Sequence, residues 1–157
     1  MRGFRPGVVL VLVVGAGFGI GSHALLAQPD YRVVHSFSGD DGRLPSTALI
    51  RASDGFFYGT TTGGGASDQG VVFRVDESGA LFHVLHALAG ADGKQPNGAL
   101  VEPAPPDGHL YGTTCLGGAT DSGTVFRVDL VGDGFTVLHD FDGVADGGSP
   151  CEARIER

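Results

Sequence analysis

Three histidines recur along the sequence at nearly constant spacing: His35, His86 and His139. Imidazole binds transition metals and titrates near neutral pH, so a ring of histidines around a channel would suit a metal site. A histidine that returns at a fixed interval equally suits a structural role, such as a hydrogen bond to a neighbouring loop. We favour the structural role, because each histidine falls near the end of a strand expected to lie far from any central axis.

Six aspartates in glycine-rich segments raise a second option, which is calcium ligation by clustered oxygens. No stretch follows an EF-hand or nonapeptide spacing, and Asp beside Gly is also the usual composition of a turn. We therefore expect these carboxylates to build turns. They are Asp40, Asp41, Asp68, Asp92, Asp121 and Asp146.

Catalytic nucleophiles have little support in the sequence. There is no G-x-S-x-G motif, and neither Cys115 nor Cys151 lies in a local catalytic signature. Tyr58 and Tyr111 recur inside apolar runs, where packing with a hydroxyl partner explains them better than acid–base chemistry. We therefore assign no catalytic, cofactor-binding or metal-ligating residue, and we expect no cofactor.

An internal repeat organises all of these residues. Residues 58–76 (YGTTTGGGASDQGVVFRVD) and 111–129 (YGTTCLGGATDSGTVFRVD) are identical at 14 of 19 positions, with a constant offset of 53. The segment 31–50 also returns at 82–101 and again at 135–155. A period of this length is typical of propeller blades and other stacked arrays.

Each unit contains four short β-like runs, which in the first unit are TALIRAS, FFYGTT, VVFRVD and LFHVLHAL. Turn residues such as Asp-Gly separate the runs. The third run alternates, with Val71, Phe73 and Val75 on one face and Val72 and Arg74 on the other. No window has a sustained helical period, so a helical domain is excluded.

Four antiparallel strands per unit form a meander, which buries both faces only when copies stack around an axis. We predict an all-β fold of β-propeller-like tandem four-stranded antiparallel blades, with about two full blades and the start of a third. A β-sandwich built from a duplicated half is the alternative. Gly59 and Gly112, inside the second run, suit places where one sheet approaches its neighbour closely.

The N-terminal segment 1–27 is predicted to be a secretory signal peptide. Arg2 and Arg5 precede an apolar run at 7–21, which is shorter than the roughly 20 residues that span a bilayer. We therefore expect export, and no transmembrane span after cleavage. The repeat region is 28–157, which we expect to be an incomplete propeller.

The net charge limits the classes of binding partner, and the two cysteines bear on whether the exported chain contains a disulfide. The formal net charge is −8, and removal of 1–27 takes away two basic and no acidic residues. Such a chain repels phosphate backbones, which excludes nucleic acid as a partner. An oxidising compartment allows a Cys115–Cys151 disulfide. The other copies carry Thr62, and Ser46 or Asn97, at these positions, so the sequence leaves the disulfide open.

The motifs Y-G-T-T and G-T-V-F-R-V-D, joined by VLHALAGADGKQPNGAL, resemble the GloVer (Gloeo/Verruco) tandem repeat of choice-of-anchor tandem repeat proteins. The resemblance covers Tyr31 to about Ile155. It implies bacterial export, many tandem copies and a sorting or anchoring signal, with no established catalytic residues. The chain departs from the pattern at its end, where Arg154 replaces Leu49 and Leu100 of the earlier copies. We expect a fragment of a longer product; the alternative is three copies closing a six-bladed ring.

These patterns favour an exported, non-enzymatic β-repeat protein, a cell-surface or secreted binding or structural module. The alternative is a fragment of a propeller-scaffold polysaccharide lyase or hydrolase. In a four-stranded blade, the strand two–three loop and the link from strand four to the next blade share one face, which makes it the expected ligand face. An extracellular glycan and self-association are the partners that the sequence leaves open.

Overall fold

The structure is a computed structural model that describes residues 9–13, 31–132 and 134–151. The described residues form strands, turns and irregular segments and contain no helix. No helix in this part of the chain is therefore long and apolar enough to cross a membrane. The strands are β1 (Val9–Val13), β2 (Tyr31–Ser36), β3 (Ile50–Arg51), β4 (Phe57–Thr61), β5 (Val71–Val75), β6 (Phe82–Ala87), β7 (His109–Thr114), β8 (Thr124–Asp129) and β9 (Phe135–Asp140).

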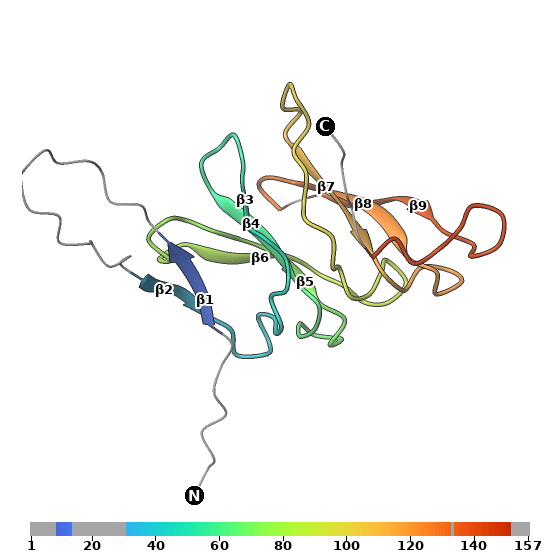
Figure 1. Cartoon of the computed structure of the whole chain (residues 1–157), viewed down its shortest axis with the longest axis horizontal. Coiled ribbons are helices and arrows are strands. Elements are labelled where there is room, and N and C mark those ends of the chain that lie inside the picture. Colours follow the sequence, from blue (N-terminus) through green and yellow to red (C-terminus); the bar gives the residue numbers. More distant parts are fainter. Residues whose placement is uncertain (1–8, 14–30, 133, 152–157) are drawn as a thin grey trace, which may run out of the picture.

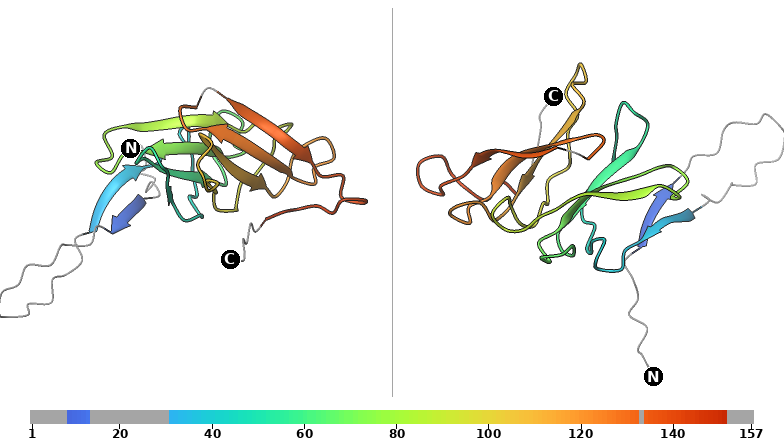
Figure 2. Two further views of the ribbon diagram at one scale, coloured as in Figure 1. Left: turned by 90° about the horizontal axis from the view of Figure 1, so that it is seen from above. Right: turned by 180° about the vertical axis from the view of Figure 1, so that it is seen from behind.

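The strands form antiparallel sheets of consecutive neighbours. The first repeat gives a four-stranded sheet in the order β3-β4-β5-β6, and the second gives a three-stranded sheet in the order β7-β8-β9. The β1–β2 pair, the first sheet and the second sheet follow one another across the molecule in chain order (Figure 1), and the other two views keep this succession (Figure 2). The all-β prediction is confirmed. The arrangement of the sheets about a propeller axis stays a prediction.

The first strand of each unit is shorter than the sequence predicts. The expected strand TALIRAS (47–53) is reduced to β3, and its counterpart in the second unit is a single bridge between Val101 and Tyr111. In the second unit the following residues are PAPP (103–106), whose prolines lack the N–H groups that a ladder needs. The second meander therefore has three strands and a bridge in place of four strands.

Both faces of the first sheet are buried, and they belong to different cores. Val71, Phe73 and Val75 of β5 pack in one core with Phe37, while Val72 packs in another core with Phe126 of the second sheet. The predicted alternation along β5 is confirmed. All four β5 residues in these cores are fully buried, because the first sheet lies between β2 on one side and the second sheet on the other.

Gly59 and Gly112 lie where space is short, as the sequence predicts, but the neighbour is different. A Cβ at Gly59 would lie 2.8 Å from the ring of Phe73, and one at Gly112 would lie 2.5 Å from the ring of Phe126. Each phenylalanine comes from the adjacent strand of the same sheet, directly opposite the glycine. The expected approach of a neighbouring sheet is therefore wrong, and the glycine makes room for a core ring of its own sheet.

The predicted signal peptide, 1–27, lies outside the described residues except for β1. β1 pairs antiparallel with β2, and Leu10 lies opposite His35 just before a register shift. Val72 lies opposite His86 with a shift at the equivalent point of the β5–β6 pair. β1 thus lies beside β2 in the same way as β5, the third strand of the first meander, lies beside β6, its fourth strand.

Candidate functional site

Each recurring histidine pairs with an aspartate of the loop that follows it. The Nε2–Oδ2 distances are 2.9 Å for His35–Asp41, 2.6 Å for His86–Asp92 and 2.6 Å for His139–Asp146. The predicted hydrogen bond to a neighbouring loop is therefore present in all three copies. The same carboxylates accept backbone N–H groups, so that each histidine is tied to a loop that its partner aspartate shapes.

The first two histidines also contact the next unit. The ring of His35 stacks on Phe82 with 3.6 Å between centroids and 2° between planes, and the ring of His86 stacks on Phe135 at 3.8 Å and 9°. Each phenylalanine begins the fourth strand of the following unit. These imidazoles therefore lie at junctions between units. Among the described residues, no three His, Cys, Asp or Glu side chains gather in a metal-binding group.

Asp41 shows how the loops use their carboxylates. Burial by itself would raise the pKa of Asp41, but hydrogen bonds from the Ser38 backbone and from His35 outweigh it and lower the pKa. Asp40 beside it is exposed. The predicted turn-building role therefore holds for Asp41, with a histidine added as a partner that the sequence did not specify.

Asp68 and Asp121 each form an ion pair on the expected ligand face. We call it the loop face, because the loops between second and third strands and the links between units meet there. Arg43 donates through Nε to Asp68 at 2.7 Å, and Lys94 donates to Asp121 at 2.9 Å. Both pairs join the link before a unit's first strand to the loop between its second and third strands. The cation in each pair, followed by the N–H of Gly64 or Gly117, lowers the pKa of the aspartate. The predicted meeting of these two segments on one face is confirmed.

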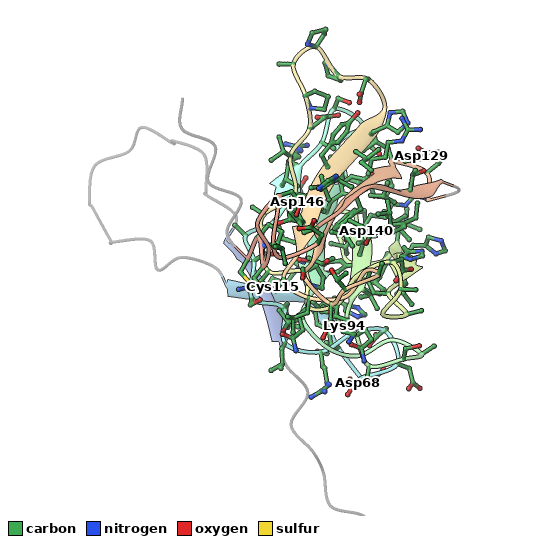
Figure 3. The ribbon with its side chains drawn as sticks, turned by 90° about the vertical axis from the view of Figure 1, so that its right-hand side faces the viewer. Asp68, Lys94, Cys115, Asp129, Asp140 and Asp146 are labelled. Atoms are coloured by element: carbon green, nitrogen blue, oxygen red, sulfur yellow. A yellow bond between two sulfur atoms is a disulfide. The ribbon has the colours of Figure 1, made fainter. Side chains whose placement is uncertain are left out.

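A pocket of about 360 Å³ opens on this loop face, between the two units. Its lining includes Arg43, Ser46 and Thr62 from the first unit, and Gln95 and Asn97 from the link into the second. Asp68, Lys94 and Cys115 lie toward the same end of the sheets, whereas Asp129 lies toward the opposite end (Figure 3). The sequence identified this face but not these side chains. The signal that could have found them is that most of these positions differ between the repeat copies.

Cys115 and Cys151 form a disulfide, with 4.5 Å between their Cα atoms. Cys115 follows β7 on the loop face, and Cys151 lies in the link that follows β9. The bond therefore joins the β7–β8 loop of the second unit to the link that follows β9. The equivalent positions at the preceding junction are Thr62 and Asn97, which line the pocket.

The opposite end of the sheets holds a second set of polar contacts. The Tyr58 hydroxyl lies 2.7 Å from Asp54 Oδ2 and 2.9 Å from the carbonyl oxygen of Leu130 in the second unit. Arg74 donates to the same carbonyl at 2.9 Å. Burial, with Asp54 adding to it, raises the pKa of Tyr58 far above its usual range. As predicted, this tyrosine packs in a strand with a hydroxyl partner.

A further histidine that sequence reasoning missed lies at that end. His109 Nε2 is 3.1 Å from Asp129 Oδ1, and both residues border a pocket of about 450 Å³ together with Asp54. The N–H and side chain of His109 also contact Asp107 of its own turn. These contacts hold the β7–β8 end together. His109 has no counterpart in the first unit, where Phe56 occupies the position, so the repeat pattern gave no signal for it.

Comparison with known proteins places the chain in a family. No curated protein and no solved structure matches the chain. The model of a protein family described as the Gloeobacter/Verrucomicrobia repeat matches residues 19–156. This match includes both meanders, the histidine junctions and the loop face. The chain therefore belongs to the Gloeobacter/Verrucomicrobia repeat family.

Proposed function

We propose that this chain is an exported, non-enzymatic β-repeat protein that serves as a cell-surface or secreted binding or structural module. The observation that carries the proposal is the repeated junction: His35 on Phe82, and His86 on Phe135. The histidines, which the sequence allows as metal ligands, here join one unit to the next. A protein built in this way repeats one rigid scaffold from unit to unit, which suits binding or scaffolding.

The contacts between the units support a propeller-like array. One core is shared by the first sheet, through Tyr58, Val72 and Leu85, and by the second sheet, through Leu110 and Phe126. Polar contacts from Tyr58 and Arg74 to Leu130 fix the same junction near one end. Such face-to-face stacking of successive meanders is the packing that a propeller repeats around its axis.

The outward face of the second sheet supports the same array. Leu85 is 8% exposed under the second unit, whereas Leu138, its counterpart, is 47% exposed. Tyr58 and Val72 are fully buried, and their counterparts Tyr111 and Val125 are partly exposed. The second sheet therefore presents the residue types that the first sheet uses to receive a neighbour.

Export is inferred from three features that agree. Segment 1–27 has the composition of a signal peptide, the remaining chain is acidic, and Cys115 and Cys151 are paired. A disulfide persists in an oxidising compartment outside the cytosol. Localisation in the source cells, followed by N-terminal sequencing of the exported chain, tests this part of the proposal.

The functional class is tested by screening the purified chain on a glycan array and against soluble polysaccharides. We expect retention of a glycan without release of reducing ends or unsaturated products. Release of either product would contradict the proposal and favour the alternative, a fragment of a propeller-scaffold polysaccharide lyase or hydrolase. Failure to bind any glycan would leave self-association, measured as oligomer mass, as the test of the structural role.

A further inference from the structure

The differences between the two copies of the 19-residue motif are concentrated on the loop face. Between 58–76 and 111–129, four of the five differing positions lie in the loop after the second strand, at 62, 63, 67 and 69. The fifth is position 71, the first residue of β5. Within these two stretches the strand residues are otherwise identical. Variation on one loop face of a fixed scaffold is typical of the face that binds a ligand.

The links into the units differ in the same way. Residues 43–46 read RLPS and residues 94–97 read KQPN, with only the proline shared. Arg43, Leu44, Ser46, Gln95 and Asn97 all line the pocket of about 360 Å³. This volume falls within the range of about 300–1,000 Å³ that is usual for small-ligand sites. Apart from the Arg43–Asp68 ion pair and the disulfide-bonded Cys115, the pocket is therefore lined largely by positions that differ between the two units.

The polar side chains of the pocket retain free hydrogen-bonding capacity. Ser46 donates to Asn97 Oδ1 at 2.9 Å, which positions the Asn97 amide. Among the described residues, the Nδ2 group of Asn97 and the side-chain amide of Gln95 make no other hydrogen bond. An amide both donates and accepts, and so does a hydroxyl group. Two exposed amides on one link thus match a ligand that carries neighbouring hydroxyls.

The charges of the pocket point to a neutral ligand. The guanidinium of Arg43 is already engaged by Asp68 through two nitrogens, at 2.7 and 2.5 Å. The pair leaves no unbalanced charge in the pocket, and the chain as a whole carries a net charge of −8. An anionic ligand would be repelled over distance and would have to displace Asp68.

The next junction is built differently. The positions of Thr62 and Asn97 are taken there by Cys115 and Cys151, and their side chains form the disulfide. Ser149 stands in place of Gln95. The pair of amides therefore occurs once in the described residues, and the site has a stoichiometry of one per chain.

We propose that the pocket lined by Arg43, Ser46, Thr62, Gln95 and Asn97 binds a neutral, hydroxyl-rich ligand, in chemical terms the terminal sugar of an uncharged glycan. This inference rests on the proposed function as a binding module and assigns it a site. Gln95 and Asn97 make the discriminating hydrogen bonds through their amides.

The test is an NMR titration of the full ¹⁵N-labelled chain with methyl α-D-glucopyranoside, maltotriose, cellotriose, xylotriose and, as an acidic probe, trigalacturonate. We expect at least one neutral probe to shift the side-chain NH₂ signals of Gln95 and Asn97 and to saturate at one molecule per chain. The double variant Gln95→Gly/Asn97→Ala should weaken that binding roughly fivefold or more, the loss of about one hydrogen bond. Glycine is chosen at 95 because the backbone there has a φ of +52°.

The matched control is Gln69→Ala, which removes an exposed amide from the same loop face but not from the pocket. It should leave the affinity unchanged. If no neutral probe shifts the Gln95 and Asn97 amides, or if only trigalacturonate binds, the inference is overturned. If the double variant binds as the parent does, the ligand lies elsewhere and the inference fails while the binding function stands. Release of reducing ends in the same samples would overturn the proposed function instead.

Discussion

The imidazole of His86 lies flat on the ring of Phe135, with 3.8 Å between the centroids, and its Nε2 bonds Asp92 at 2.6 Å. One side chain thus joins a loop of its own unit to the first residue of β9 in the next unit. His35 does the same with Phe82 and Asp41. The repeat therefore encodes its own junction, and a histidine that could bind metal is used as a connector.

The histidine junction can be tested by substitution. His86→Ala removes the stack on Phe135 and the bond to Asp92, and we expect it to lower the free energy of unfolding by about 1–3 kcal/mol. His139→Ala is the control, because its side chain is 49% exposed against 27% for His86, and among the described residues its aromatic contact is an edge contact with Phe141 and not a stack. Urea unfolding followed by far-UV circular dichroism measures both. Equal losses in the two variants would contradict the connector role.

The core between the two sheets can be tested with a second pair of equivalent residues, Leu85 and Leu138. Leu85→Ala should destabilise the chain by about 2–4 kcal/mol, because it removes a side chain buried between the sheets. Leu138→Ala changes the equivalent residue of the second unit, which is 47% exposed, and should change stability by less than about 1 kcal/mol. Thermal unfolding of both variants checks the difference. A Leu138 variant as unstable as the Leu85 variant would mean that a neighbour covers the second sheet under the conditions used.

Tyr58 and Tyr111 occupy equivalent positions but make different contacts. The Tyr58 hydroxyl reaches the second unit, whereas the Tyr111 hydroxyl bonds within its own turn. Tyr58→Phe removes the hydroxyl that lies between Asp54 and the Leu130 carbonyl, and we expect a loss of about 1–2 kcal/mol. Tyr111→Phe removes a hydroxyl that bonds Asp107 in its own turn, and the effect should stay within about 0.5 kcal/mol. Chemical unfolding of both variants gives the comparison, and the reverse order would contradict the assigned contacts.

The disulfide should stabilise the chain in a redox-dependent way. The bond closes a segment with a sequence separation of 36 residues, for which chain-entropy arguments give a stabilisation of about 3–4 kcal/mol. Dithiothreitol should therefore lower the unfolding midpoint of the parent chain. It should not affect a Cys115→Ser/Cys151→Ser variant, whose midpoint should match that of the reduced parent. A midpoint that ignores reductant in both chains would show that the bond is not formed.

Acid should destabilise the folded chain. Backbone N–H groups of Val144 and Ala145 lower the pKa of Asp142 from an ordinary value near 3.8 to about 2. Asp68 and Asp121 are shifted in the same direction. Because the folded-state pKa values are lower, the unfolded chain takes up protons first as the pH falls. Stability is therefore fully present above about pH 5 and declines from pH 4 toward pH 2.

Unfolding midpoints measured between pH 7 and pH 2.5 test this expectation. Asp142→Asn keeps an acceptor for the two N–H groups but does not titrate, so it should make the decline shallower. A midpoint that rises on acidification would contradict the direction of the shifts.

The repeat, the all-β class and the alternation along β5 could be predicted from the amino-acid sequence, because they depend on local periodicity and on residue types that recur in each unit. The sequence also indicated the structural use of His35, since a side chain that returns with the repeat is expected to serve the repeat. The stacking partner of that histidine could not be predicted from the sequence, because Phe82 comes from the following unit and only packing brings the two rings together.

Other features depend on how segments that are remote in the chain pack together. The tertiary structure placed the ring of Phe73 over Gly59, where the sequence predicted a neighbouring sheet, because side chains on paired strands meet at a register that the sequence alone does not specify. It paired Cys115 with Cys151, since a disulfide depends on the distance between two segments that are remote in the chain. The pocket beside Asn97 likewise exists only where links and loops of two units meet in space.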